Sequence, residues 1–174
     1  MSDPTPDKTT ADWIADQVET NPEFAEQFAT IVKALEDGNL SLADVGGFAP
    51  DEIDAAHACA CHHLTLGEPA KALAVVSSLL LLDPKRAEFY LTAAIAMHHL
   101  KRFDEADAFY GQADALRPDD AVTLMYRGEA CVLAKQREVG IPLMKRGIAL
   151  AADAVSLKPY VQRASRILQI AETK

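Results

Sequence analysis

The sequence has few of the features that mark secreted or membrane proteins. Cysteine occurs only three times in 174 residues, an odd number without disulfide-framework spacing, which favours a reducing compartment. The most apolar run, Leu79 to Leu82, is far shorter than the roughly 20 residues that cross a bilayer. The first ten residues lack the basic and apolar stretches of a secretory signal. We therefore expect a cytoplasmic protein without a membrane partner.

Positive charge is also scarce. The net charge is −9 and the isoelectric point about 4.9. Because nucleic-acid binding draws mainly on cationic side chains that neutralise phosphates, this balance argues against a nucleic-acid partner. The basic residues that do occur gather late in the chain, at Arg137, Lys145, Arg146, Arg163 and Arg166. On amphipathic helices such residues form either a solvated face, which is the commoner case, or a basic docking patch.

The residues that could carry chemistry do not form a recognisable catalytic or metal site. His57 with Cys61, and Cys59 with His63, are pairs at helical i,i+4 spacing, but the two pairs point in different directions. No CxxC pair or second ligand cluster completes four coordination positions. No glycine-rich loop carries the lysine and hydroxyl residues of a phosphate cradle. We expect neither enzymatic activity nor a bound metal or cofactor.

What the sequence does contain is a repeat of 34 residues. Small residues and a closing proline recur at this interval: Ala60, Ala94 and Gly128; Ala72, Ala106 and Gly140; and Pro84 and Pro118. This pattern is typical of stacked helix–turn–helix units, because small side chains let paired helices cross closely. No segment shows the alternation of a strand. The pattern predicts an all-α fold.

The unit from Ala87 to Asp120 resembles the tetratricopeptide repeat (TPR). Counted from Ala87, the residues of matching size are Tyr90 at position 4, Ala94 at 8, Ala106 at 20, Tyr110 at 24, Ala113 at 27 and Pro118 at 32. The flanking units, 53–86 and 121–154, are weaker but keep the register. The sequence therefore predicts a TPR-like superhelical array of three helix–turn–helix repeats.

The rest of the chain is divided by capping and helical patterns. Residues 1–10 read as a disordered tail and 11–49 as an N-terminal helical region. Thr9 with Asp12 predicts a capping box, and Asn21-Pro22 predicts the start of a second helix. The repeats occupy 50–154, and their six helices are expected at about 50–66, 69–82, 85–100, 103–116, 119–134 and 137–151. Residues 155–174 are predicted to form a capping helix, which a solenoid needs to cover its apolar end. Ser156 is the predicted cap of this helix, and Pro159 is tolerated in its first turn.

In TPR proteins the first helix of each repeat, helix A, lines a concave groove through positions 2, 5, 9 and 12. The predicted peptide-binding residues at these positions are His57, Cys61, Leu64, Leu91, Ile95, His98, Val122, Met125, Glu129 and Val132. Six of them are apolar, where a soluble monomer prefers polar groups. Each apolar residue alone fits a core position equally well, but their recurrence in successive repeats favours a groove. Some TPR co-chaperones bind the acidic C-termini of heat-shock proteins through a carboxylate clamp, which includes cationic groove residues. The groove positions of this sequence lack those cations.

The order of parts resembles the class II chaperones of bacterial type III secretion systems. An N-terminal helix is followed by Gly38-Asn39-Leu40, by Phe48 to Ile53, by three repeats and by one capping helix. The resemblance covers Ile31 to Ala171 and is best at Leu80–Pro84, Phe103–Tyr110 and Gly128–Cys131.

The resemblance to these chaperones implies a partner and an oligomeric state. It implies that the groove holds an extended N-terminal segment of a hydrophobic translocator protein and keeps it unassociated and secretion-competent. It also implies a homodimer, for which Trp13, Phe24 and Phe28 are the candidate interface residues; packing of these residues onto the first repeat is the alternative. A TPR scaffold of an unrelated complex is the alternative function.

Overall fold

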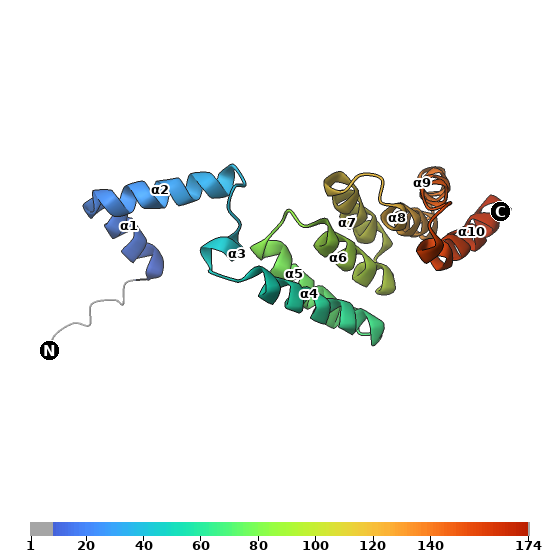
Figure 1. Cartoon of the computed structure of the whole chain (residues 1–174), viewed down its shortest axis with the longest axis horizontal. Coiled ribbons are helices and arrows are strands. Elements are labelled where there is room, and N and C mark those ends of the chain that lie inside the picture. Colours follow the sequence, from blue (N-terminus) through green and yellow to red (C-terminus); the bar gives the residue numbers. More distant parts are fainter. Residues whose placement is uncertain (1–8, 174) are drawn as a thin grey trace. The chain divides into compact units, whose positions relative to one another are not determined.

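The structure is a computed structural model that describes residues 9–173, and all the regular elements among them are helices (Figure 1). The chain divides into two units. The first, up to Gly47, contains α1 (Thr10–Thr20), α2 (Pro22–Glu36) and α3 (Leu42–Val45). The second, from Phe48, contains α4 (Pro50–Thr65), α5 (Pro69–Leu82), α6 (Ala87–His99), α7 (Phe103–Leu116), α8 (Ala121–Leu133), α9 (Arg137–Leu150), a 3-10 turn (Val155–Leu157) and α10 (Lys158–Glu172). The predicted all-α class is confirmed.

Local capping explains where the helices of the first unit begin. The Thr9 and Asp12 side chains form the predicted capping box, each accepting a hydrogen bond from the other residue's backbone N–H. Asn21 caps α2 by accepting from the Phe24 N–H at 3.2 Å, and Pro22 is the first helical residue. The predicted disordered tail falls mainly on residues 1–8, which lie outside the described residues.

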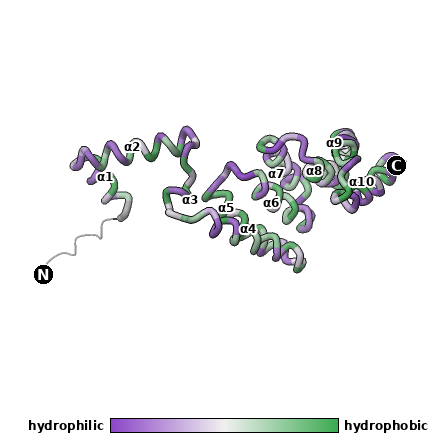
Figure 2. Tube along the Cα trace, in the orientation of Figure 1, coloured by the Kyte–Doolittle hydropathy of each residue, from purple (hydrophilic) through white to green (hydrophobic). Residues whose placement is uncertain are grey.

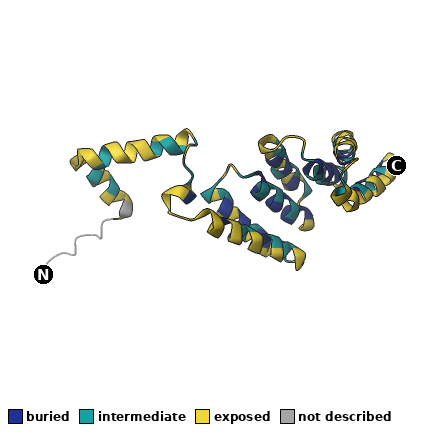
Figure 3. Ribbon diagram, in the orientation of Figure 1, coloured by how far each residue is buried: buried dark blue, intermediate teal, exposed yellow. Residues whose placement is uncertain are grey.

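In the second unit the small residues allow the helices to pair. Within the repeats α4 packs against α5, α6 against α7 and α8 against α9. Ala60 and Ala72, and Ala94 and Ala106, are completely buried where the first two pairs cross. Figure 3 shows that burial is concentrated along α6, α8 and their neighbours, and Figure 2 shows the mixture of hydrophobic and hydrophilic residues that amphipathic helices require.

The third repeat has glycine where the second has alanine, and its two helices approach more closely. A Cβ atom at Gly128 would lie 2.6 Å from the carbonyl oxygen of Gly140, and a Cβ at Gly140 would lie 2.5 Å from the carbonyl oxygen of Gly128. A Cβ at Gly147 would lie 2.8 Å from Cγ of Met125. The contact between α8 and α9 is therefore made by backbone, which only glycine permits.

Each helix A ends in the same way. Gly67, Lys101 and Lys135, which are 34 residues apart, all have positive φ values, between 61° and 73°. The following residue's N–H then bonds to a carbonyl five residues back, as from Glu68 to His63 at 2.9 Å. This is the Schellman ending, in which a left-handed residue closes the helix. The 34-residue register is thus repeated in the backbone geometry of the turns.

The C-terminal helix begins differently from the prediction. The predicted cap, Ser156, lies inside the short 3-10 turn, and Leu157 precedes α10 without any side-chain cap. Pro159 occupies the first turn of α10, as predicted. Leu157, Val161 and Ala164 pack against a cluster that contains Ala121, Met125, Ile148 and Ala151. The helix therefore covers the apolar end of the third repeat.

Candidate peptide-binding face

We use the name groove face for the surface formed by positions 2, 5, 9 and 12 of α4, α6 and α8. Of the ten predicted binding residues, seven are half-buried: His57, Cys61, Leu64, Leu91, Ile95, Val122 and Val132. Leu91 and Ile95 also pack against the buried cluster of Ala94, Met97, Ala106 and Tyr110. These two residues therefore contribute to the core and still expose part of their side chains.

Met125 occupies position 5 of α8 but is not exposed on this face, so its prediction as a binding residue is corrected. Its side chain is only 3% exposed and lies with Ala121, Ala151 and Ala164 beneath α10. The absence of a side chain at Gly147 makes room for it. Met125 is therefore a core residue of the third repeat.

His98 and Glu129 are also buried, at 8% and 7% exposed, so their prediction as direct peptide contacts is corrected too. The His98 ring stands edge-on to Phe103 and lies 3.5 Å, through Nε2, from an oxygen of Glu129. The Glu129 carboxylate accepts two hydrogen bonds from Arg163 of α10, at 2.9 and 2.8 Å. Neither side chain is free to meet a ligand in this structure.

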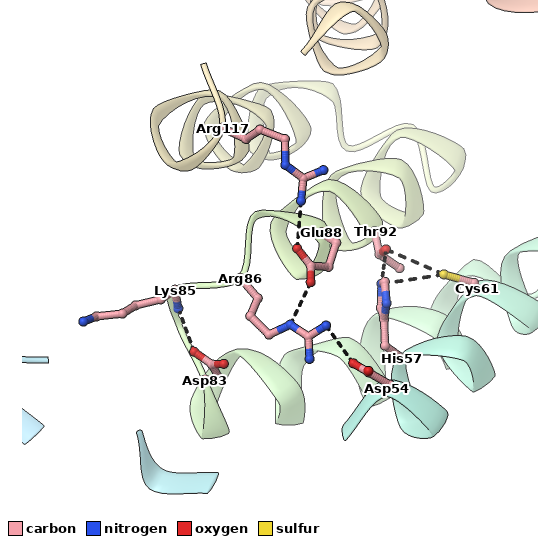
Figure 4. A network of polar contacts seen from close by, with 9 residues as sticks. All are labelled: Asp54, His57, Cys61, Asp83, Lys85, Arg86, Glu88, Thr92 and Arg117. Carbon is pink, nitrogen blue, oxygen red and sulfur yellow. Dashed lines mark hydrogen bonds and ion pairs between the residues drawn. The ribbon is translucent and has the colours of Figure 1, made fainter. Parts of the chain in front are cut away.

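A chain of alternating charges crosses one end of the groove face (Figure 4). Arg86 is within 2.7 Å of both Asp54 and Glu88, and Arg117 donates to Glu88 at 3.0 Å. Burial works against ionisation of Glu88, but its hydrogen bonds and the nearby Arg86 outweigh it and lower its pKa. Because each arginine has a carboxylate partner, this end of the face offers no unpaired cation.

Beside these charges, His57 links α4 to α6. Its Nε2 lies 2.8 Å from the Thr92 hydroxyl and 3.6 Å from Sγ of Cys61 (Figure 4). Burial lowers the pKa of His57. The nitrogen that faces the thiol is thus already engaged by Thr92, so the pair is not arranged as a nucleophile and its free base.

The remaining histidines and cysteines do not gather around these two. Cys59 is exposed, and His63 contacts Glu68 at 2.8 Å. Among the described residues, no group of three His, Cys, Asp or Glu side chains is placed to hold a metal ion.

The C-terminal helix contributes residues that the sequence interpretation missed. Tyr160 stands edge-on to Tyr126 at 6.0 Å, and the Arg163 guanidinium lies over the Tyr126 ring at 5.2 Å. The signal was present in the sequence, since Tyr126 with Tyr160, and Glu129 with Arg163, are each one 34-residue period apart. Treating residues 155–174 only as a cap concealed this continuation.

The pairing with Arg163 also sets the charge state of Glu129. Burial alone would raise the pKa of this carboxyl group, but hydrogen bonds from His98 and Arg163 outweigh burial and lower it. The carboxylate is therefore charged at neutral pH, and α10 supplies a cation that balances it.

The candidate interface residues of the first unit lie on one side of the α1–α2 hairpin. Phe24 is half-buried between Trp13, 5.7 Å away edge to face, and Phe28, 5.9 Å away and stacked. Trp13 is 50% exposed and Phe28 37%. Exposed rings of this size on a short hairpin are unusual for a surface in contact with water only.

The fold and the register of this face are those of a tetratricopeptide-like array of helix pairs. The family profile described as tetratricopeptide repeat matches residues 63–125. A comparison of the sequence with curated proteins finds no match. Among the described residues, no helix has both the length and the apolar composition needed to cross a membrane.

Solved structures with the same fold are components of type III secretion systems. A type III secretion complex from Aeromonas hydrophila shares 20% identity, with a TM-score of 0.75 over 83% of this chain and 96% of that chain. The translocator chaperone SycD of Yersinia enterocolitica shares 16%, with a TM-score of 0.67 over 75% of this chain and 97% of that one. PcrH, known from Pseudomonas aeruginosa, was solved with the chaperone-binding region of PopD; it shares 16% identity and a TM-score of 0.67 over 73% and 96%.

These structural neighbours confirm the predicted resemblance at the level of the fold. SycD is a translocator chaperone, and PcrH was solved with the chaperone-binding regions of PopB and PopD. SycD was also solved as an alternative dimer and with a peptide of the translocator YopD. At 16–20% identity the similarity establishes a shared architecture.

Proposed function

We propose that this protein is a cytoplasmic chaperone of a bacterial type III secretion system. It binds an extended apolar segment of a translocator protein on its groove face and keeps that protein unassociated and secretion-competent. The proposal is supported above all by one observation: Leu64, Leu91, Ile95, Val122 and Val132 are partly exposed on successive A helices of a fold shared with translocator chaperones. The alternative is a TPR scaffold in an unrelated complex.

The size of the apolar surface fits reversible binding. Fully burying an aliphatic side chain contributes about 1.5–3 kcal/mol, and these side chains are already largely buried, so each offers at most about a third of that. Micromolar affinity requires about 8 kcal/mol net. Several anchors must therefore act together, as an extended segment that crosses successive repeats allows. No nucleotide is needed, because binding alone protects the client.

The test replaces groove residues that do not hold the core together. Leu91 and Ile95 pack against buried residues, so aspartate there would also harm folding. Leu64 and Val122 are half-buried, and neither belongs to these clusters. We expect Leu64→Asp with Val122→Asp to weaken client binding by about 100-fold or more, since two anchors are lost and two carboxylates are placed in an apolar contact. Co-purification from secreting cells, followed by mass spectrometry, measures this.

The matched control is Leu81→Asp. Leu81 is 72% exposed on α5, outside the groove face, and should leave client binding unchanged. Circular dichroism checks that all variants remain helical. Undiminished capture of a translocator by the double variant would reject the groove face as the binding site. Capture of proteins unrelated to secretion would favour the scaffold alternative.

We also propose that the first unit mediates formation of a homodimer through Trp13, Phe24 and Phe28. The exposed rings of Trp13 and Phe28 support this assignment. Replacing both with alanine is expected to weaken self-association at least tenfold, because each loses about 1 kcal/mol or more of apolar burial. Sedimentation velocity over a concentration series measures the change, and Leu150→Ala, at a 48% exposed leucine, is the control. Unchanged sedimentation would favour packing of these rings within the chain.

A further inference from the structure

The helix α10 continues the repeat register beyond the third repeat. Arg163 lies 34 residues after Glu129, at position 9 of a further unit, and bonds to it in the way that neighbouring A helices contact each other. Tyr160 lies 34 residues after Tyr126 and contacts its ring. Earlier neighbouring A helices also make a side-chain contact, from His57 of α4 to Thr92 of α6, although at positions 5 and 6 of the repeat. In its repeat positions and in its contacts with α8, α10 corresponds to the A helix of a fourth repeat.

This fourth helix carries cations at positions 9 and 12, where the earlier A helices carry no lysine or arginine. Position 9 holds Cys61, Ile95, Glu129 and then Arg163; position 12 holds Leu64, His98, Val132 and then Arg166. Residues three apart share one face of a helix, so Arg166 projects beside Arg163. Arg166 is exposed, and no described residue forms an ion pair with it.

Arg163 also retains binding capacity. A guanidinium has five N–H groups, and two of those on Arg163 bond to Glu129. Its side chain remains 49% exposed. Residues 121–173 contain eight Lys and Arg against four Asp and Glu, a net charge of +4 in a chain whose total is −9. The groove face therefore runs from a charge-balanced end at Glu88 to a cationic end on α10.

We infer that α10 extends the groove face and that Arg163 and Arg166 select client segments with a carboxylate beside their apolar residues. The inference rests on the proposed function and names the chemistry of its client: an extended segment whose aspartate or glutamate side chain lies on α10 while its apolar residues lie on the repeats. Carboxylates suit this position because a guanidinium fork binds them through charge-assisted hydrogen bonds. The cations absent from groove positions of the three repeats are thus supplied by the helix that follows them.

The experiment uses the full chain and a phage-displayed library of random 12-residue peptides. Peptides enriched on the immobilised wild-type protein are synthesised with each Glu or Asp retained or replaced by Gln or Asn, and their affinities are measured by fluorescence anisotropy. We expect the acidic form to bind roughly three- to tenfold more tightly, the scale of one charge-assisted contact at a partly exposed site. Raising the salt concentration should reduce this ratio.

The variant Arg166→Gln should reduce the preference for the acidic peptide to less than twofold. Lys158→Gln is the matched control, because Lys158 is an exposed cation in the first turn of the same helix, about 12 Å along its axis from Arg166. Apolar enrichment without an acidic preference, or a preference that survives Arg166→Gln, would overturn this inference and leave the proposed function standing. Absence of apolar enrichment, or its persistence in the Leu64→Asp, Val122→Asp protein, would contradict the proposed function itself.

Discussion

Replacing Gly128 or Gly140 with alanine is expected to reduce the free energy of unfolding by about 3 kcal/mol, because the added Cβ atom must displace backbone rather than a flexible side chain. At both positions the new atom would lie within 2.6 Å of the other glycine's carbonyl oxygen. Real Cβ atoms do not approach backbone so closely, so α8 and α9 must move apart. For a chain of this size the melting temperature should fall by roughly 6–12 °C.

Gly111→Ala is the matched control for these substitutions. Gly111 also lies inside a helix, but its added Cβ would meet only the Arg127 side chain, 3.5 Å away. Alanine is a better helix former than glycine, so this variant should gain about 0.5–1 kcal/mol. Urea unfolding followed by circular dichroism compares the three variants. Equal stability of the Gly128→Ala and Gly111→Ala proteins would mean that α8 and α9 are not in backbone contact.

Replacing Arg163 with alanine is expected to destabilise the protein at pH 7 and to reverse the pH dependence that Glu129 contributes. In the wild type, the pKa of Glu129 is lower in the folded chain than in the unfolded one. Its contribution to stability is therefore present above the unfolded pKa, about 4.3, and is lost as the pH falls through the folded pKa. Without Arg163, burial dominates, and protonation of Glu129 should favour the folded state.

Solvent access to the Arg163 site reduces the expected loss in the free energy of unfolding. Breaking a fully buried ion pair costs about 3–5 kcal/mol, but Arg163 is half-exposed and water can reach the vacated site, so we expect about 2 kcal/mol at pH 7. Urea unfolding at pH 7 and pH 5 should show the difference from wild type shrinking at the lower pH. Arg146→Ala removes an exposed pair with Asp119 and should change little at either pH. A deficit that is the same at both pH values would show that Glu129 is not left as an uncompensated charge.

Much of the fold could be predicted because its determinants are local and repeated. The 34-residue spacing of Ala60, Ala94 and Gly128 placed every helix pair, and the six repeat helices begin and end within about two residues of the expected bounds. The Thr9 and Asn21 caps were likewise readable, since each involves residues only three apart. The missed feature at this level was the 3-10 turn before α10, which has no capping residue to announce it.

The candidate site was harder to predict because exposure depends on neighbours that are distant in sequence. Position 5 holds the half-buried Leu91 in α6 and the buried Met125 in α8. The difference arises because α10 packs more extensively on α8 than α8 packs on α6, and because Gly147 leaves room for the Met125 side chain. Helix α10 also turns Glu129 from a groove residue into the partner of Arg163. The repeat position alone would place Leu91 and Met125 on the same surface, although only Leu91 is partly exposed there.

The amino-acid sequence by itself determined the helices, their pairing and the register that carries Leu64, Leu91 and Val122 onto one face, because small residues, caps and apolar spacing act within one or two helical turns. Only the tertiary structure decided which side chains of that face remain accessible. That depends on the stacking of α10 against α8, where Arg163 meets Glu129 one full period away and Met125 is enclosed. Whether a side chain is buried depends on the helices packed around it. The sequence pattern identifies those helices only when the 34-residue register is followed through α10.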